Sequence, residues 1–426
     1  FPYTTLFRSG EERRRGGGPR PQLPAPAGLA TCAAIAGLQV TDGQLRALPW
    51  LPGWVDQADH DPALAAAAAE RRRFGPEDIG PDADPFMQRL GRVRYRSVGQ
   101  RAAIRSALLT PPGATAAIDL PTGEGKSLVF QAINEVGFAS DSPQAAAEGI
   151  TLVLVPTVAL AYDHENACRK TKDERLAYVG GADEECRAAI RARVGKENQG
   201  LVFAAPEAAC RSLRPALVAA ARAGRLKAIV VDEAHLVDAW GTGFRTDFQS
   251  LSGLRRELLE LAPHDRAPRT ILLSATLTPE TLATLRALFS NPGEFRLLSA
   301  GQVRPEPDYW TSSPATAEER IARVVEALCR LPRPAILYVT EVAEAKAWGK
   351  RLIDLGFRRL ATFHGQTPDE LRKRTLDRWR EGVLDLVVAT SAFGLGIDYP
   401  HVRAIVHACV PETFDRFYQE VGRGGR

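Results

Sequence analysis

The chain has 426 residues, of which 45% are hydrophobic and 25% charged, with a net charge of only +4 and a pI near 8.8. These values are typical of a globular chain with two or three domains that bury substantial cores. The small net charge excludes a general attraction to nucleic acid, so any such affinity must come from a local groove.

The cysteine spacing and the apolar runs exclude two further kinds of protein. No cysteines show the paired C-x-x-C spacing of a zinc site, and we interpret them as reduced, mostly structural thiols. They are Cys32, Cys168, Cys186, Cys210, Cys329 and Cys409. No apolar run is long enough to span a bilayer, and there is no secretory signal, so we expect a cytoplasmic protein without a membrane partner.

The start of the chain is unlike the rest. Residues 1–9 look like a translated sequencing adapter, and we exclude them from structural reasoning as a non-native scar. No initiator Met precedes them and the only Met is Met87, which fits a gene fragment. Residues 10–94 form an N-terminal extension, with a Gly-, Pro- and Arg-rich part (10–26) that we expect to be disordered. We assign this extension no chemistry.

A phosphate-binding loop is the first feature with chemistry. Residues 114–120 predict a strand, residues 120–127 (Leu-Pro-Thr-Gly-Glu-Gly-Lys-Ser) a Gly-rich turn, and residues 128–136 a helix. Backbone N–H groups of such a turn, with the helix dipole behind them, hold the phosphates of a nucleotide. Lys126 is expected to reach the β- and γ-phosphates, and the Ser127 hydroxyl to hold Mg²⁺.

Three further loop residues, Thr122, Gly123 and Gly125, complete the predicted phosphate cradle. Leu120 stands where the strict pattern has its first Gly, and a lone Gly-Lys-Ser often lies in an ordinary loop. The loop therefore needs a second element to be decisive.

That second element follows an apolar run at residues 227–231, which predicts a buried parallel strand. The run ends in Asp232-Glu233-Ala234-His235, and carboxylates at this end of a strand face the ligand crevice of an open α/β sheet. We expect Asp232 to bind Mg²⁺ and Glu233 to orient and deprotonate the attacking water. The alternative is a solvated acidic turn, which the upstream phosphate loop disfavours.

The run from Asp232 to Phe248 resembles the Walker B box and aromatic-rich loop of superfamily 2 helicases, in the RecQ-like branch. In that branch the loop senses single-stranded DNA and relays its presence to ATP hydrolysis. Here Trp240, Phe244 and Phe248 are expected to stack on unpaired bases, and Arg245 to meet a phosphate or a base face. Core packing is the alternative, but the interleaved Gly241, Gly243 and Asp247 favour a loop.

Other boxes of the family occur in its order from about Tyr95 to Arg426. The resemblance implies that Gln100 recognises the edge of the adenine base and that Thr157 contacts the backbone of the nucleic-acid strand along which the protein moves. It also assigns His235, Ser274, Thr276 and Gln419 to the coupling of hydrolysis to unwinding. For Gln100 the alternative is an ordinary surface residue, and for Thr157 a strand-to-helix turn without a ligand.

A second α/β lobe is predicted to begin at the strand of residues 335–339, and residues 384–390 form another buried strand. By resemblance, Thr390 touches DNA and Asp398 faces the nucleotide. The chain closes with the family's arginine box, in which Arg423 and Arg426 are the candidates to meet the γ-phosphate. A flexible basic terminus is the alternative.

The predicted fold is therefore α/β, with two tandem RecA-like lobes, each a parallel sheet flanked by helices, after a mostly helical or irregular extension. Lobe 1, the ATP-binding helicase domain, covers residues 95–301, and lobe 2, the helicase C-terminal domain, covers residues 302–426, with a hinge at residues 302–307. Family members continue past the arginine box, so we expect a chain truncated at both ends with an incomplete lobe 2 and weak unwinding. A further interpretation is that the chain is a divergent relative of this branch from a bacterial DNA-modification cluster.

The resemblance implies an ATP-dependent DNA helicase that uses ATP and Mg²⁺, moves 3′ to 5′ on single-stranded DNA and unwinds duplexes. The expected partner is DNA with a single-stranded region, and no protein partner is assigned. An RNA helicase and a duplex translocase that does not separate strands remain as alternatives, since the motor core is shared. A nucleotide-gated DNA clamp is a third, which the presence of Glu233, Arg423 and Arg426 disfavours.

Overall fold

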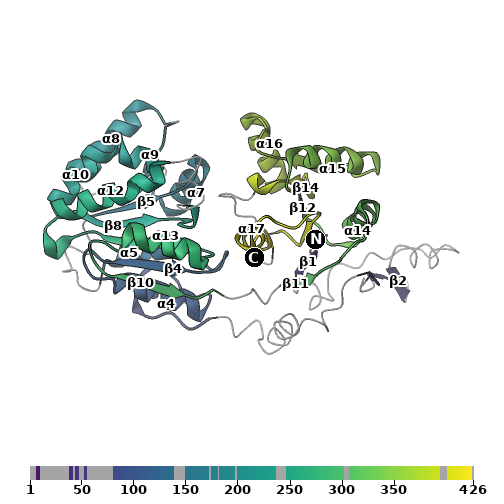
Figure 1. The fold of residues 1–426 in the computed structure, drawn as a ribbon, viewed down its shortest axis with the longest axis horizontal. Helices are drawn as coiled ribbons and strands as arrows, with labels where there is room; N and C mark the ends of the chain where they lie inside the picture. The colour runs from purple at the N-terminus through teal and green to yellow at the C-terminus, as the bar shows by residue number, and fades with distance from the viewer. Residues whose placement is uncertain are drawn as a thin grey trace. The chain divides into compact units, whose positions relative to one another are not determined.

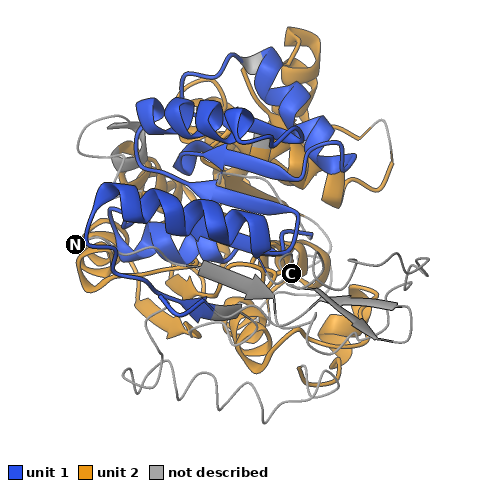
Figure 2. Cartoon of the chain, turned by 90° about the vertical axis from the view of Figure 1, so that its right-hand side faces the viewer, with its two compact units in different colours: residues 1–73, 304–393, 399–426 blue, residues 74–303, 394–398 orange. Residues whose placement is uncertain are grey.

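The computed structural model of the protein describes residues 6–9, 38–41, 44–47, 52–54, 80–138, 149–171, 174–180, 182–196, 199–236, 246–301, 307–393 and 401–424. The chain forms two compact units, and we describe each by itself (Figures 1 and 2). Unit 1 contains residues 1–73, 304–393 and 399–426, and unit 2 contains residues 74–303 and 394–398.

Unit 2 is built on a seven-stranded sheet in which every neighbouring pair is parallel. Its strands, in spatial order, are β10 (Phe295–Ser299), β4 (Thr115–Asp119), β9 (Arg269–Ser274), β8 (Leu226–Val231), β5 (Ile150–Leu154), β7 (Gly200–Ala204) and β6 (Ala177–Tyr178). The central strands are continuous apolar runs, because both faces of this sheet are covered and neither side of a strand meets water.

Helices cover the two faces through two separate cores. Strand residues alternate between them: Ile118, Val230 and Ile271 belong to one core, and Ala117, Val231 and Leu272 to the other. The first core is closed by α3 (Pro85–Arg89), α4 (Val98–Leu108), α5 (Ser127–Val136) and α7 (Val158–Cys168). The second is closed by α8 (Glu184–Lys196), α9 (Pro206–Cys210), α10 (Arg214–Arg222), α12 (Thr246–Leu261) and α13 (Pro279–Phe289), with η3 (His264–Arg266) after α12.

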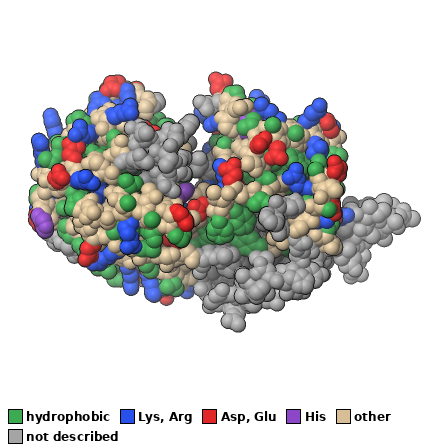
Figure 3. Space-filling view, in the orientation of Figure 1, with side chains coloured by type: hydrophobic (Ala, Val, Ile, Leu, Met, Phe, Trp, Pro, Cys, Tyr) green, Lys and Arg blue, Asp and Glu red, His purple; other side chains and the backbone are tan. Residues whose placement is uncertain are grey.

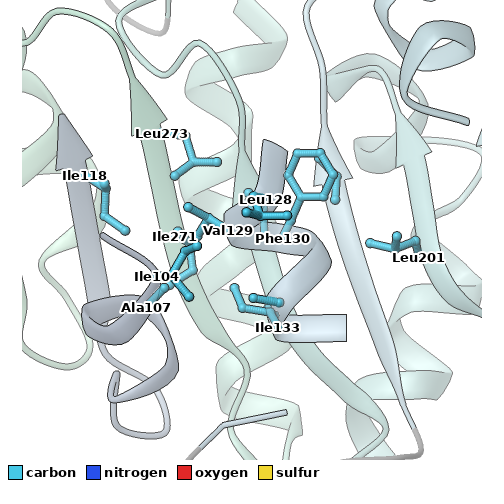
Figure 4. Close-up of a cluster of buried hydrophobic side chains, with 14 of the residues drawn as sticks. Ile104, Ala107, Ile118, Leu128, Val129, Phe130, Ile133, Leu201, Ile271 and Leu273 are labelled. Atoms are coloured by element: carbon cyan, nitrogen blue, oxygen red, sulfur yellow. The ribbon is translucent and has the colours of Figure 1, made fainter. Parts of the chain in front are cut away.

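The buried stripe of α5 anchors the phosphate loop to the sheet. Leu128, Val129, Phe130 and Ile133 pack toward the strands, as Figure 4 shows. All four are buried, so the first turn of α5 is held firmly beside the end of β4.

The strand register brings the carboxyl ends of β4, β9 and β8 to one edge of the sheet. Asp119 is paired with Ser274, and Val231 with Leu272. The segments that follow β4 and β8 are the phosphate loop and Asp232-Glu233, so they leave the sheet on either side of β9.

Unit 1 holds a six-stranded sheet. In spatial order its strands are β11 (Pro307–Trp310), β1 (Leu6–Ser9), β15 (Ala404–His407), β12 (Ala335–Tyr338), β14 (Leu386–Ala389) and β13 (Leu360–Phe363). The four strands from β15 to β13 are parallel. The helices of this unit are α14 (Ala317–Arg330), α15 (Val342–Asp354), α16 (Asp369–Arg380), η4 (Ser391–Phe393) and α17 (Phe414–Val421). A separate hairpin joins β2 (Leu38–Thr41) to β3 (Gln44–Ala47).

The structure differs from the sequence prediction at the start of the chain. We excluded residues 1–9 from the fold, whereas Leu6–Ser9 form strand β1, which pairs antiparallel with β11 and β15. Such pairing uses backbone groups that any extended segment offers to an open strand edge, so it does not bear on the origin of these residues. The adapter-like scar stays a prediction.

The predicted fold class is confirmed, because both units are α/β with parallel strands and flanking helices. The predicted strands at 227–231 and 335–339 correspond to β8 and β12, with ends that differ by one residue. Within the part of the chain that the structure describes, five cysteines are free thiols. None of the described helices is long and apolar enough to cross a membrane.

Arg255 of α12 connects the beginnings of β4 and β9, at the edge of the unit 2 sheet opposite the phosphate loop. Its side chain is only 1% exposed. The guanidinium donates to the Thr270 hydroxyl (2.7 Å), the Thr115 hydroxyl (3.0 Å) and the carbonyls of Asn291 (2.8 Å) and Pro292 (2.9 Å). Removing it leaves several buried acceptors without donors.

We therefore expect Arg255→Met to lower the free energy of unfolding by about 3 kcal/mol, measured by chemical denaturation. The neighbouring Arg256 is exposed and provides the matched control. Arg256→Met should change the same quantity by less than about 0.5 kcal/mol. Equal losses in the two variants would contradict this assignment.

Candidate functional site

The phosphate loop runs from Leu120, which is buried after β4, to Ser127 at the start of α5. Gly123 (φ 87°) and Gly125 (φ 80°) both adopt the left-handed backbone region, which side chains with a Cβ disfavour. Lys126 is the N-cap of α5, and no side chain caps this helix. The N–H groups of Leu128 and Val129 donate to the Gly125 and Lys126 carbonyls (3.0 Å each), whereas the N–H of Ser127, the first residue of α5, is not capped by a side chain and suits an anion, as a phosphate site requires.

Two residues hold this loop in place through hydrogen bonds: Arg96, which precedes α4, and Gln100, which lies in α4. Gln100 is 1% exposed, and its side-chain amide accepts from the backbone N–H of Arg96 (2.7 Å) and donates to the Glu124 carbonyl (2.8 Å). The Arg96 guanidinium donates to the Gly123 carbonyl. Arg96 was missed by sequence reasoning, although it belongs to the same short segment as Gln100.

Gln100 keeps one amide N–H and one carbonyl lone pair beyond these two bonds. One donor and one acceptor are what the edge of an adenine requires, so the residue fits the predicted role. That role stays a prediction, and the bonds in the structure show that Gln100 also shapes the loop.

Lys126 and the acidic pair lie together at the sheet edge. Lys126 Nζ is 3.7 Å from Glu233 Oε1, and both side chains are largely buried. Glu233 has a φ of 50°, and it is the one non-glycine residue with a positive φ among those described. A left-handed backbone at such a residue costs about 1–3 kcal/mol and is found mainly at functional sites.

Asp232 is buried, at 5% exposure, and both of its carboxylate oxygens have partners. Oδ1 accepts from the Glu233 N–H (3.0 Å), and Oδ2 lies 3.3 Å from His164 Nε2. Burial alone would raise the pKa of this carboxyl, but the His164 hydrogen bond and the charges of His164 and Lys126 lower it below the usual value. Asp232 is thus held as a carboxylate, the form that binds a divalent cation.

His235 joins the acidic pair to the end of β9. Its Nδ1 is 3.0 Å from Ser274 Oγ and 3.6 Å from Glu233 Oε2. The Ser274 hydroxyl donates to the Thr276 carbonyl (2.6 Å), so its single proton is committed and His235 Nδ1 is the donor between the two side chains. The structure thus brings together three of the residues predicted to couple hydrolysis to unwinding.

The donor set fits Mg²⁺ bound together with a nucleotide. Within the described residues no group of three or more His, Cys, Asp or Glu side chains could hold a metal by itself. Mg²⁺ is usually bound by one or two carboxylates, phosphate oxygens and water. The Ser127 hydroxyl and the Asp232 carboxylate, two groups of the oxygen type that Mg²⁺ prefers, stay the predicted protein ligands.

The Thr157 hydroxyl accepts from the Leu160 N–H (3.2 Å) and caps α7, so a structural role is visible for this residue. Thr390 is buried at the end of β14, and its N–H donates to the Phe363 carbonyl (3.1 Å). Contact of either residue with DNA stays a prediction.

In unit 1, α17 carries Gln419 and leads into Arg423. The helix is held to β15 by Glu420, whose Oε2 lies 2.8 Å from the buried His407 Nε2, and its Tyr418 and Val421 side chains are also buried. The Arg423 N–H donates to the Glu420 carbonyl (3.1 Å).

Several predicted site residues lie outside the described part of the chain. They are Trp240, Phe244, Arg245, Asp398 and Arg426. Phe248 lies in α12, but its side chain is also outside what the structure describes.

Two family models match the chain. The DEAD/DEAH box helicase model covers residues 97–285, and the helicase conserved C-terminal domain covers residues 319–426. Curated RecQ-type proteins match across both. The chain belongs to the RecQ-like branch of the superfamily 2 helicases.

Among the relatives of this RecQ-like chain is the ATP-dependent DNA helicase RecQ of Bacillus subtilis, 29% identical over 79% of this chain and 53% of the relative. The ATP-dependent DNA helicase Q1 of Rattus norvegicus is 28% identical over 72% of this chain and 48% of the relative. The chain thus spans about half the length of these relatives. A solved structure of the DUF1998 helicase MrfA bound to DNA has the same fold, with a TM-score of 0.60, 19% identity and coverage of 81% of this chain and 49% of that one.

The geometry of Gly125 predicts a loss of nucleotide binding on substitution. A Cβ there would lie 2.6 Å from Gln100 Nε2, on a backbone that already disfavours side chains. We expect Gly125→Ala to weaken binding of a fluorescent ATP analogue at least tenfold, or about 1.4 kcal/mol, because Gln100 must leave the loop.

Gly91→Ala is the matched control, because Gly91 has a similar φ of 66° and open space around its Cβ position. Both variants should lose about 1 kcal/mol of stability from the backbone, but only Gly125→Ala should lose affinity. Similar affinity of the two variants for the ATP analogue would contradict the assignment of Gln100 and Gly125 to the nucleotide site.

Proposed function

We propose that this chain is the motor core of an ATP-dependent DNA helicase that binds ATP and Mg²⁺ and moves along DNA with a single-stranded region. The observation that carries the proposal is the continuous set of contacts at the sheet edge of unit 2. Lys126 lies beside Glu233, and His235 lies beside both Glu233 and Ser274. Phosphates can bind beside Lys126, and the contacts from Glu233 through His235 to Ser274 connect that site to the end of β9.

ATP binding is assigned to the phosphate loop. The backbone of Thr122, Gly123 and Gly125 surrounds the phosphates, and Lys126 neutralises charge on the β- and γ-phosphates. Gln100 selects adenine, and Ser127 and Asp232 hold Mg²⁺, which supplies further neutralisation of phosphate charge when bound. The low pKa of Asp232 supports its part in this set.

Hydrolysis is assigned to Glu233, which accepts a proton from the attacking water. The buried Glu233 Oε2 makes no hydrogen bond within the described residues, so an acceptor is available for that water. Arg423 and Arg426, from unit 1, neutralise the charge that spreads over the γ-phosphate in the transition state, and Asp398 faces the nucleotide.

DNA binding is assigned to both units. Trp240, Phe244 and Phe248 stack on unpaired bases, Arg245 meets the backbone or a base, and Thr157 and Thr390 contact the strand. Among the described side chains, acidic and basic groups are interspersed on the face drawn in Figure 3, so this face carries no single sign of charge that would attract nucleic acid as a whole.

Coupling is assigned to His235, Ser274, Thr276 and Gln419. ATP draws the two units together and its hydrolysis releases them, so alternating closure moves the protein along the strand. The proposed direction is 3′ to 5′, and duplex unwinding follows from this movement.

The decisive experiment measures the ATPase rate with no nucleic acid, with single-stranded DNA, with duplex DNA and with single-stranded RNA. We expect strong stimulation by single-stranded DNA. A rate unchanged by DNA counts against the proposal, stimulation by RNA instead points to an RNA helicase, and stimulation by duplex without strand displacement points to a translocase.

Lys126→Ala should lower the ATPase rate about 100-fold or more, because phosphate charge is no longer neutralised. Lys170→Ala is the control, since Lys170 lies on the same unit with 70% of its side chain exposed. A rate in Lys126→Ala close to that of the control would refute the loop assignment.

Glu233→Gln should bind ATP with near-normal affinity but lose at least about 100-fold in turnover, since the amide cannot accept the proton of the attacking water. Binding is measured with a fluorescent ATP analogue and turnover by phosphate release. Unchanged turnover in this variant would refute the assignment of Glu233 as the base, whereas a parent chain that binds the analogue without sustained turnover would favour the clamp alternative.

A further inference from the structure

We propose that His164 is a positioning residue that orients the Asp232 carboxylate for the divalent cation of the nucleotide complex. This inference rests on the proposed function. His164 lies outside the phosphate loop and the Asp232–His235 box, and no local sequence pattern marks it.

The fold places His164 beside Asp232 through neighbouring strands. Strand β5 is paired with β8, with Leu154 opposite Val231, and the Asp232 N–H donates to the Leu154 carbonyl (2.9 Å). Helix α7 starts just after β5, with Thr157 as its N-cap. The second turn of α7 therefore lies over the end of β8, and His164 is the residue that meets Asp232 there.

The contact determines how the carboxylate is oriented. His164 Nε2 lies 3.3 Å from Oδ2, while the Glu233 N–H binds Oδ1. With one partner on each oxygen, rotation about the Cβ–Cγ bond of Asp232 would break both bonds. Each carboxylate oxygen still has lone pairs available for a cation.

The imidazole is itself held by aromatic packing. It stacks on Phe203 of β7, with ring centroids 5.5 Å apart and an interplanar angle of 27°, and it meets the edge of Phe130 of α5 at 5.2 Å. Phe130 and Phe203 are both fully buried. His164 therefore links Asp232 to α5, the helix that begins with Ser127, the other proposed Mg²⁺ ligand.

A purely structural reading treats His164 as one more aromatic ring in this cluster. The two readings differ in one atom, the ring nitrogen that faces Asp232. Phe keeps the ring and loses that nitrogen, whereas Gln loses the ring but places its amide nitrogen at the same number of bonds from Cβ. These two substitutions separate the hydrogen bond from the packing.

The test measures how Mg²⁺ tightens the binding of a fluorescent, non-hydrolysable ATP analogue to the whole chain. We expect His164→Phe to raise the Mg²⁺ concentration for half-maximal effect about tenfold, as is typical when the partner of a metal ligand is removed. Binding of the analogue in EDTA, which does not involve the cation, should stay within about twofold of the parent. His164→Gln should recover most of the Mg²⁺ affinity.

His264→Phe is the control, because His264 is exposed in η3, and its Mg²⁺ dependence should equal that of the parent. Thermal unfolding without nucleotide is measured for all variants. An unchanged Mg²⁺ requirement in His164→Phe overturns the inference. So does an equal increase in His164→Phe and His164→Gln that follows their loss of thermal stability. Absence of analogue binding by the parent would instead count against the proposed function.

Discussion

The register of three neighbouring parallel strands, β4, β9 and β8, determines where the candidate site lies. All three end at the same edge of the unit 2 sheet, and β9 is the middle strand. The phosphate loop and the acidic pair therefore emerge on either side of the Ser274 segment. A shift of one residue in this register would turn every buried side chain of a strand to the opposite face, so the two cores of the unit also maintain the site.

Charge balance at this edge connects the two motifs. Lys126 has an acidic neighbour in Glu233, and Asp232 is kept ionised by His164 and Lys126 despite its burial. Buried charges of one sign need partners of the other, and here each partner comes from a different element. The left-handed backbone of Glu233 adds a local strain that the surrounding sheet holds in place.

Unit 1 has the same kind of parallel core, and its final helix, α17, leads into Arg423, one of the two predicted arginines. The buried pair of His407 and Glu420 ties α17 to the end of β15, and the rings of His407 and Phe417 also pack together between this strand and this helix. These contacts fix α17, and with it the backbone of Arg423, to the sheet of unit 1.

Sequence alone determined the fold class, the phosphate loop and the Asp232–His235 box. Each of the two motifs is a contiguous run of residues, in which an apolar strand is followed by a turn of characteristic residue types. Such runs can be recognised in the sequence without knowing which residues they contact. The family resemblance likewise depends on the order of short motifs.

Only the tertiary structure showed the contacts between these motifs and the rest of the chain. Gln100, a candidate from the sequence, and Arg96, which the sequence did not mark, contact the loop from a segment ahead of it, and His164 reaches Asp232 from the helix after another strand. These contacts join residues that are distant in sequence and depend on strand order, which no local pattern encodes. For the same reason, the resemblance assigned His235 and Ser274 to the same task, but their contact is seen only in the structure, where β8 and β9 are neighbours.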